Sequence, residues 1–320
     1  MNEKPLVSII INNYNYGVHL QEAIDGALNQ TYKNVEVIVV DDGSVDNFRE
    51  VIASYGNQII AVLKENGGQA SALNAGFKAS KGDIICLLDA DDIFLPNKVS
   101  EIVEWFQLNT SIDWVFNESL PMTSEDISKV DLTSILNPEL DISHKNNLQI
   151  IDFRTNIINA ELPNFAPSTS NLCFSRKILE KIFPLPEIKG FSGLAICDLY
   201  LKYVAVGIST GYSSKKNLGI FRIHENNRYT TQEINNKRSI DAEILMVSGY
   251  WMLVKFPSLS KLSQKIFSKG LANYLRSNNQ KINYSDCIKK YIFKLSIIDQ
   301  LKMLSMTIYY FIKLGFVHLV

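Results

Sequence analysis

Short apolar runs alternate with helical patterns over the first third of the chain. The runs are rich in β-branched residues and occupy positions 6–11, 35–40, 59–64 and 83–88, with a fifth at 113–116. Between them, apolar residues recur at the three- and four-residue spacing of an amphipathic helix. Strands of this length alternating with helices predict an α/β fold, with a mostly parallel sheet flanked by helices on both faces.

The later chain is less regular. Polar residues with Pro and Asn breaks fill 118–165 and predict loops and short helices. The next stretch, to about residue 225, contains two helical pieces and the extended run NLGIFRIH, and from 229 the pattern is helical to the end. The predicted organisation is an α/β domain over 1–228, with halves at about 1–117 and 118–228, followed by a C-terminal helical region over 229–320.

A polar segment leaves each of the four main predicted strands. These segments read NNYNYG, DDGS, ENGGQ and DADD, in chain order. In open parallel sheets, ligands bind outside the carboxyl ends of the strands. The topology therefore predicts that all four segments meet at one edge of the sheet and form a ligand site.

Asp89, Asp91 and Asp92 crowd into the DADD segment directly after an apolar strand. An isolated aspartate here would be interpreted as a turn or helix-capping residue. Three carboxylates this close repel one another unless a cation offsets them. The D-x-D spacing puts two on the same side of an extended segment, which suits a hard divalent cation that also takes phosphate oxygens. Such a cation stabilises a diphosphate leaving group.

The other two segments are weaker signals taken alone. Asp41 and Asp42 in DDGS fit an Asx-type turn, and also fit hydrogen bonding to a base or a ribose. Gly67 and Gly68 allow close backbone approach at a helix N-terminus, where anions are favoured, or form a plain loop. Neither GxGxxG nor GxxxxGK[ST] is present, so neither a dinucleotide fingerprint nor a P-loop is supported.

Composition narrows the function classes. The chain has 320 residues, 46% hydrophobic, and a formal net charge of −1, so no global field favours nucleic acid. Its four cysteines form no CxxC pair, which argues against a zinc or redox motif. No basic segment with an apolar core opens the chain, and no apolar run reaches about 18 residues. A cytoplasmic protein with free thiols is the expectation.

The motifs VSIIINNYNYG, VDDGS, ENGGQASALNAG and LLDADDIFLPNK, in this order and at these separations, resemble the nucleotide-sugar half of family 2 glycosyltransferases. The resemblance covers residues 5–110 closely and 165–226 more loosely. It implies a Rossmann-like GT-A fold and an inverting transfer from a nucleotide sugar, and the favoured donor is a UDP-sugar. The implied cofactor is Mn²⁺ or Mg²⁺, and the implied acceptor is a glycan or a lipid-linked hydroxyl in surface polysaccharide synthesis.

The resemblance also implies roles for residues at the sheet edge. Asp91 would be the main metal ligand, and Tyr14 would stack on the base. Most relatives have Pro-Thr where this chain has Asn12-Asn13. The implied nucleotide-sugar contacts are Asn13, Tyr14, Asn15, Asp41, Asp42, Gly67, Gly68, Ser71, Asp89 and Ala90.

The second half supplies the remaining implied roles. The family places an acidic general base, often the second residue of an E-D pair, at a helix start, and Asp198 matches it although Cys197 replaces the usual Glu. The segment FRIHENN matches an Arg-x-His-x-x-Asn pattern, which puts His224 at the metal or diphosphate with Arg222 in support. The implied acceptor-side residues are Asp92, Thr169, Ser170 and Asn171.

Several alternatives stay open at this point. The C-terminal helices either pack on the α/β domain or a partner subunit, or form an interfacial surface that brings the protein to the inner face of the cytoplasmic membrane. The missing Glu before Asp198 keeps a non-catalytic nucleotide-sugar or glycan-binding protein under consideration. A sugar nucleotidyltransferase ranks lower, because NNYNYG carries no cation to clamp a triphosphate.

Overall fold

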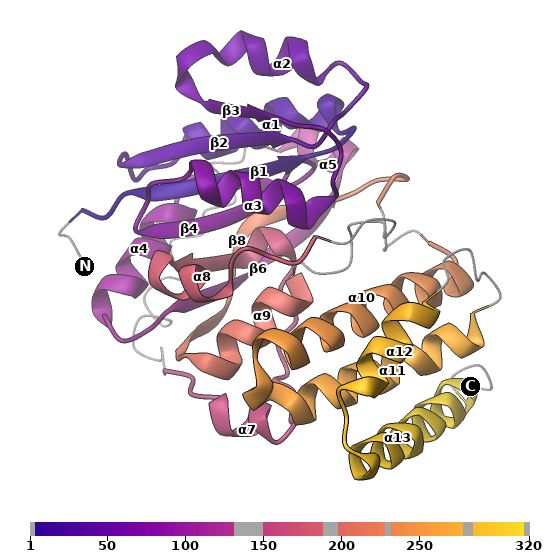
Figure 1. The fold of residues 1–320 in the computed structure, drawn as a ribbon. Helices are drawn as coiled ribbons and strands as arrows, with labels where there is room; N and C mark the ends of the chain where they lie inside the picture. Colours follow the sequence, from indigo (N-terminus) through magenta and orange to yellow (C-terminus); the bar gives the residue numbers. More distant parts are fainter. Residues whose placement is uncertain (1–3, 131–149, 188–197, 228–231, 278–283, 317–320) are drawn as a thin grey trace.

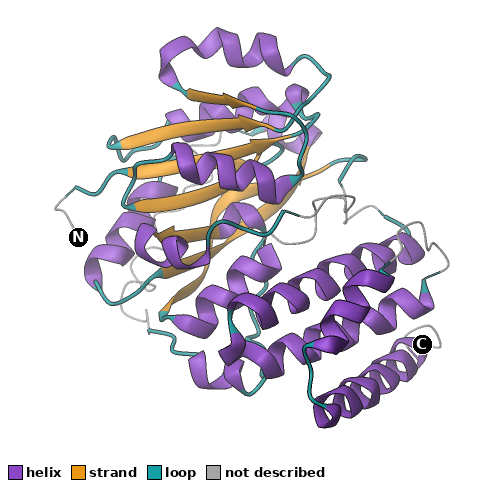
Figure 2. Cartoon of the chain, viewed as in Figure 1, coloured by secondary structure: helices purple, strands orange, loops and turns teal. Residues whose placement is uncertain are grey.

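The computed structural model describes residues 4–130, 150–187, 198–227, 232–277 and 284–316 (Figure 1). A single mixed sheet lies against a wholly helical C-terminal region, with helices on both faces of the sheet (Figure 2). The strands of the sheet, in spatial order, are β3 (Ile60–Leu63), β2 (Val35–Asp41), β1 (Val7–Asn13), β4 (Ile84–Asp89), β7 (Leu172–Ser175), β6 (Trp114–Thr123), β8 (Gly211–Ile223) and β5 (Ile93–Phe94).

The first four strands along the chain are parallel, as the sequence predicts. β2 pairs with β1 and with β3, and β1 pairs with β4, all in parallel register. β7 runs antiparallel between β4 and β6, and β5 is antiparallel to β8. The β1 register sets Asn13 beside Asp41 and Asn12 beside Asp89. Polar strand ends therefore meet at one edge.

Alternate side chains of the buried strands supply two separate cores. Ile9 and Ile11 of β1 belong to the core on one face, and Ile10 belongs to the core on the other. This division follows from the two-residue period of a strand. Full burial of each such side chain contributes about 1.5–3 kcal/mol, so the uninterrupted apolar runs fix the strands between two helical layers.

Helices α1 (Gly17–Leu28), α2 (Phe48–Tyr55) and α4 (Lys98–Leu108) contribute to the core shared with Ile9. The opposite face is covered by α3 (Gln69–Ala79), α8 (Arg176–Ile182) and α9 (Asp198–Ile208). Shorter elements complete this part of the chain: α5 (Ser124–Lys129), α7 (Arg154–Ile158) and the 3₁₀ turns η1 (Gly56–Gln58) and η3 (Thr169–Asn171). A further 3₁₀ turn, η4 (Pro257–Leu259), lies in the C-terminal region.

The C-terminal region consists of α10 (Ile234–Lys255), α11 (Ser260–Arg276), α12 (Ser285–Phe293) and α13 (Ile297–Phe316). Leu245 and Val247 of α10 and Ile266 of α11 belong to the same core as Ile10. The core therefore continues from the sheet into the helical region across residue 228. None of the described helices combines the length and the apolarity needed to cross a bilayer.

Two features of the sheet and one helix start differ from the expectation. The fifth strand extends beyond 116 to Thr123, although NESLP carries no strand pattern, because it pairs along β8. β5 and β7 have two and four residues, which is too short for a periodic signal. Asp92 does not cap the following helix, since α4 begins after Asn97.

Candidate active site

A cavity of about 660 Å³ opens at the carboxyl ends of β1, β2 and β4. Its volume lies in the range of small-molecule sites. Strand ends and glycine loops form part of its wall, and α9 and α10 form another. Nine predicted site residues line it: Asn13, Tyr14, Asp42, Gly68, Asp89, Ala90, Asp91, Thr169 and Asp198.

Asp89 ends β4 at the wall of this cavity. Its Oδ1 accepts hydrogen bonds from Asn12 Nδ2 at 2.7 Å and from Gln69 Nε2 at 2.9 Å. Burial, reinforced by the neighbouring charge of Asp91, raises the pKa of Asp89 to about 7, and the Asn12 hydrogen bond opposes the rise. Asn12 and Gln69 therefore hold Oδ1 of Asp89 in place at the cavity wall, and Thr169 also hydrogen-bonds this carboxyl group.

Asp41 braces the turn that follows β2. Its Oδ1 accepts from Asn13 Nδ2 at 2.8 Å, and its Oδ2 accepts from the backbone N–H of Gly43 and Ser44. Asp41 is 1% exposed and does not line the cavity. The same turn holds Asn15, whose backbone N–H donates to Ser44 Oγ at 2.8 Å. Asp41 thus positions Asn13.

Asp42 does line the cavity and ties it to the glycine loop. Lys64 Nζ lies 2.6 Å from its Oδ1, which also accepts from Gly67 N, while Oδ2 accepts from Gly68 N at 2.7 Å. Gly68 precedes α3 with a φ of 86°, a conformation that costs other residues energy. Gly67 and Ser71 flank this turn without lining the cavity.

Asp91 faces His224, which follows β8. Asp91 Oδ2 and His224 Nε2 are 3.1 Å apart, and the backbone N–H of Asn226 donates to His224 Nδ1 at 3.2 Å. With Nδ1 accepting, a neutral ring carries its proton on Nε2 and donates it to Asp91. Tyr16 packs edge-on against this ring, with centroids 5.4 Å apart, and its hydroxyl donates to Asn226 O.

The donor set suits a cation that takes most of its ligands from elsewhere. Among the described residues, no group of three or more His, Cys, Asp or Glu side chains is arranged to hold a metal ion. Asp91 and His224 provide a pair, which fits Mg²⁺ or Mn²⁺ completed by phosphate oxygens and water. Coordination through His224 Nε2 requires the ring proton to move to Nδ1, at the expense of the Asn226 hydrogen bond.

Asp92 plays a different part from its neighbour. It is 2% exposed and does not line the cavity. Ser170 Oγ donates to its Oδ2 at 2.6 Å, and Arg222 N donates to its Oδ1 at 3.0 Å. Burial and the charges of Asp91 and Asp89 raise its pKa well above the usual range. Asp92 therefore joins the end of β4 to η3 and β8.

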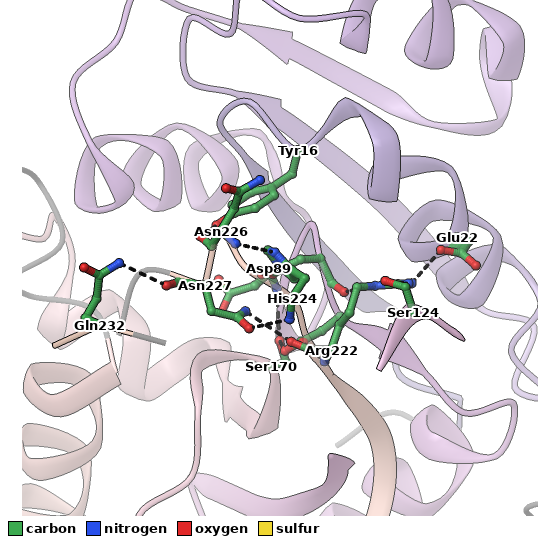
Figure 3. Close-up of polar contacts among 12 residues, drawn as sticks. Tyr16, Glu22, Asp89, Ser124, Ser170, Arg222, His224, Asn226, Asn227 and Gln232 are labelled. Carbon is green, nitrogen blue, oxygen red and sulfur yellow. Dashed lines mark hydrogen bonds and ion pairs between the residues drawn. The ribbon is translucent and has the colours of Figure 1, made fainter. Parts of the chain in front are cut away.

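Arg222 is a buried cation that fixes the Asp91 segment from behind. Its Nε donates to Asp91 O at 2.8 Å, and its two terminal nitrogens reach Ser124 Oγ and Glu22 Oε2 (Figure 3). Its side chain is 2% exposed. Arg222 therefore supports the backbone at Asp91. The guanidinium group does not line the cavity, and none of these hydrogen bonds reaches His224.

His19 was not predicted from the sequence. It extends from α1 toward His224, with ring centroids 4.9 Å apart. Burial, Arg222 and His224 lower its pKa to about 4, so the ring is neutral at pH 7. The signal that could have identified it is its position two residues into the helix that leaves NNYNYG, one turn from that predicted loop.

Asp198 begins α9 and reaches the cavity from the other side. Its Oδ1 accepts from the backbone N–H of Leu199 at 2.6 Å. Burial raises its pKa, and the charge of Lys202, one turn later, opposes the rise. Lys202 also lines the cavity, as do Ile240, Asp241 and Ile244 of α10. Cys197, the departure from the E-D pair, lies outside the described residues.

The predicted acceptor loop forms η3, and only its first residue lines the cavity. Thr169 lines the cavity, whereas Ser170 does not, and its hydroxyl donates a hydrogen bond to Asp92. Asn171 Oδ1 accepts from Asn117 Nδ2 at 2.7 Å and from Ser119 Oγ. Of these three residues, Thr169 lines the cavity, while Ser170 and Asn171 anchor the turn to neighbouring strands.

Known proteins resemble both the sequence and the fold. The family described as Glycosyl transferase family 2 matches residues 8–183. An uncharacterised glycosyltransferase of Nostoc sp. (strain PCC 7120) is 30% identical over 282 residues, which cover 85% of this chain and 83% of that protein. The family match includes the four polar segments at the sheet edge.

Two solved structures share the fold at low identity. S. aureus TarS 1–349, in complex with UDP-GlcNAc, gives a TM-score of 0.60 at 13% identity and covers 96% of this chain and 89% of that one. The mannosyltransferase PcManGT from Pyrobaculum calidifontis, in complex with GDP-Man and Mn²⁺, gives 0.51 at 16% identity, with coverages of 98% and 87%. These are GT-A glycosyltransferases. By its sequence and its fold, the chain belongs to glycosyl transferase family 2.

Proposed function

We propose that the protein transfers a sugar from a UDP-linked donor to a hydroxyl of a glycan or lipid-linked acceptor, with inversion, in the synthesis of a surface polysaccharide. The observation that carries this proposal is one shared cavity. The polar ends of β1, β2 and β4 line it together with Asp198, a carboxylate with a raised pKa. A binding site for an activated sugar and a candidate base therefore face the same space.

The donor's nucleoside would lie against β1 and β2. Asn13 is 1% exposed, and among the described residues its Oδ1 has no hydrogen-bond partner. A buried amide oxygen without a partner costs free energy, and an N–H or O–H of a bound nucleoside would satisfy it. Tyr14 lines the same cavity and offers a ring for stacking. The complex of TarS with UDP-GlcNAc supports uridine as the first base to test.

The diphosphate would lie near Asp91, with Mn²⁺ or Mg²⁺. Asp91 would bind the cation, and His224 would either join it or hold the carboxylate through its Nε2 proton. When bound, such a cation stabilises the negative charge that develops on the departing diphosphate. The complex of PcManGT with GDP-Man and Mn²⁺ supports a divalent cation in this fold. Arg222 keeps the Asp91 backbone in place through the carbonyl oxygen.

Asp198 would act as the general base. The acceptor oxygen attacks the anomeric carbon while the bond from that carbon to the phosphate oxygen breaks. The electron pair of the broken bond leaves with the nucleoside diphosphate, and the acceptor proton passes to the Asp198 carboxylate. A single displacement of this kind inverts the anomeric centre. The raised pKa of Asp198 makes it a stronger base than an exposed aspartate.

Turnover of a panel of UDP-sugars with Mn²⁺ tests this function. UDP release, accelerated by a glycan acceptor, is the expected result for the wild-type chain. Asp91→Asn and Asp198→Asn should each abolish most of it, whereas Asp152→Asn, an exposed ion-pair residue outside the cavity, should not. Tight binding of UDP-sugars without turnover under any condition would contradict the enzyme and favour a binding protein.

A further inference from the structure

Charge is divided unequally along the chain. Residues 257–320 contain ten Lys or Arg and only two Asp or Glu, which gives this segment a net charge of +8. Because the whole chain has a net charge of −1, residues 1–256 have a net charge of −9. This division follows the boundary between α10 and α11. A basic tail on an acidic domain indicates a surface that meets an anionic partner.

The terminal helix α13 also exposes a continuous row of large apolar side chains. We define the outer face of α13 by Ile297, Ile298, Leu301, Leu304, Ile308 and Ile312, each of which is at least 52% exposed. The spacing of three and four residues keeps them along one side of the helix. Phe293, at the end of α12 just before it, is 89% exposed.

The opposite side of α13 is already packed. Met303 and Thr307 are buried, and the helix runs along α11 at the edge of the molecule (Figure 1). The outer face therefore lies on the side of α13 that points away from α11, and polar residues such as Lys302 and Lys313 flank it. An exposed apolar row of this length marks a surface that another body covers.

We propose that the outer face of α13 binds the surface of an anionic lipid bilayer. Exposed Lys302 and Lys313 lie on α13, and exposed Lys294 lies just before it, at the end of α12. These lysines would meet lipid headgroups while the isoleucines enter the apolar boundary, although Lys302 also pairs with the exposed Asp299. An apolar row along one side of a helix, with lysines beside it, is typical of a helix that lies on a bilayer surface. This inference does not depend on the proposed function.

The charge and apolarity of this region argue against a second copy of the chain and against nucleic acid as partners of the outer face of α13. A second copy of this chain would bring a region of +8 against a region of +8, which opposes association through α13. Nucleic acid would satisfy the lysines and leave the row of isoleucines and leucines exposed. An anionic bilayer offers negative charge for the lysines and an apolar interior for the row of isoleucines and leucines.

Vesicle flotation with the full chain tests the inference. Vesicles of phosphatidylcholine alone are compared with vesicles containing about 30% phosphatidylglycerol, at low salt and at about 0.5 M salt. The expected result is binding to the anionic vesicles, weak binding to the neutral ones, and a loss of binding at high salt. Absence of binding to anionic vesicles at low salt overturns the inference.

Two sets of variants locate the contact. Leu301→Gln, Leu304→Gln and Ile308→Gln combined should reduce binding by about tenfold or more. The matched control changes Leu108, Ile150 and Leu162, which are also exposed, to Gln. Lys294→Gln, Lys302→Gln and Lys313→Gln combined should flatten the salt dependence, and Lys177→Gln with Lys181→Gln on α8 serves as the control.

Further readouts keep the result unambiguous. All substituted positions are exposed, so circular dichroism and the melting temperature should match the wild type. Equal loss of binding in the control variants contradicts a site on α13. A concentration-dependent dimer, seen by sedimentation and abolished by the three Gln changes, would assign the face to a second copy and also overturns the inference. UDP-sugar turnover without vesicles reports the proposed function separately.

Discussion

Lys202 lies one helical turn after Asp198 on α9, and both side chains line the cavity. Burial raises the pKa of Asp198 and lowers that of Lys202, and each charge opposes the shift of the other. The positive charge of Lys202 therefore favours the charged form of a buried carboxylate next to the cavity. The basicity of Asp198 depends on this lysine.

Lys202→Met should move the acid limb of the kcat/KM profile to higher pH. Without the positive charge, the pKa of Asp198 rises further, so more of the base is protonated at a given pH, and the lost rate returns as the pH increases. Lys202→Arg should retain the wild-type limb. The measurement is UDP release against pH with saturating acceptor. An unchanged limb in Lys202→Met would mean that Asp198 is not the group that titrates.

Asp198→Asn should lower kcat by about 10²–10⁴-fold, because a general base contributes this much to proton transfer. Donor KM should change little, since Asp198 lies on α9 rather than among the strand-end residues. Stopped or continuous UDP detection gives both constants. Loss of donor binding with normal kcat would place Asp198 in donor recognition instead.

Asp91 and Asp92 should respond differently to substitution. Asp92→Ala leaves Ser170 Oγ–H and Arg222 N–H buried without their acceptor, at about 1–3 kcal/mol each in the free energy of unfolding. Asp91→Asn retains most contacts and should leave stability near the wild type while removing the response to Mn²⁺. Urea denaturation and metal titration of UDP release compare the two. Equal destabilisation of both variants would contradict these separate roles.

Asp42→Asn should weaken the glycine loop and raise the donor KM. The carboxylate accepts charge-assisted hydrogen bonds from Lys64 and from two backbone N–H groups, and loss of its charge should cost about 1–3 kcal/mol. Asp152→Asn breaks an exposed ion pair with Arg154 and should cost about 0–1 kcal/mol. Urea unfolding midpoints give the comparison. If the two variants lose equal stability, Asp42 does not brace the loop.

Metal removal should stop turnover without unfolding the protein. The described fold is stabilised by its apolar cores. Near the predicted metal site, the described residues offer only Asp91 and His224 as ligands. EDTA should therefore leave the melting temperature of the free protein unchanged. UDP with Mn²⁺ should raise the melting temperature more than either alone, because each completes the site of the other. A large fall in melting temperature with EDTA alone would indicate a structural metal.

The apolar pattern was sufficient for β1, β2 and β4, because these strands are largely buried on both faces and their runs are uninterrupted. It also indicated β3, whose apolar run lies at the exposed edge of the sheet. It also placed the polar segments at one edge, since parallel strands share a direction. The pattern could not separate Asp41 from Asp42. The two are adjacent in sequence, and only the turn geometry decides that one braces Asn13 while the other faces the cavity.

Long-range contacts explain the other gaps. Asp92 is paired with Ser170 and Arg222, which lie 78 and 130 residues later, so no local motif announces its role. The cavity residues of α10 follow the α/β domain in sequence and have an ordinary helical pattern. Their place in the site depends on how α10 packs on α9, which becomes visible only in three dimensions.

The shared core that runs from Ile10 through Leu245 to Ile266 has a practical consequence for engineering. A chain cut at residue 228 would uncover apolar surface on α9 and the sheet and would also remove the wall of the cavity that α10 forms. Chimeras that exchange acceptor preference between relatives should therefore carry α9, α10 and α11 together as one unit. The helical region therefore shares a hydrophobic core with the sheet and cannot be exchanged on its own.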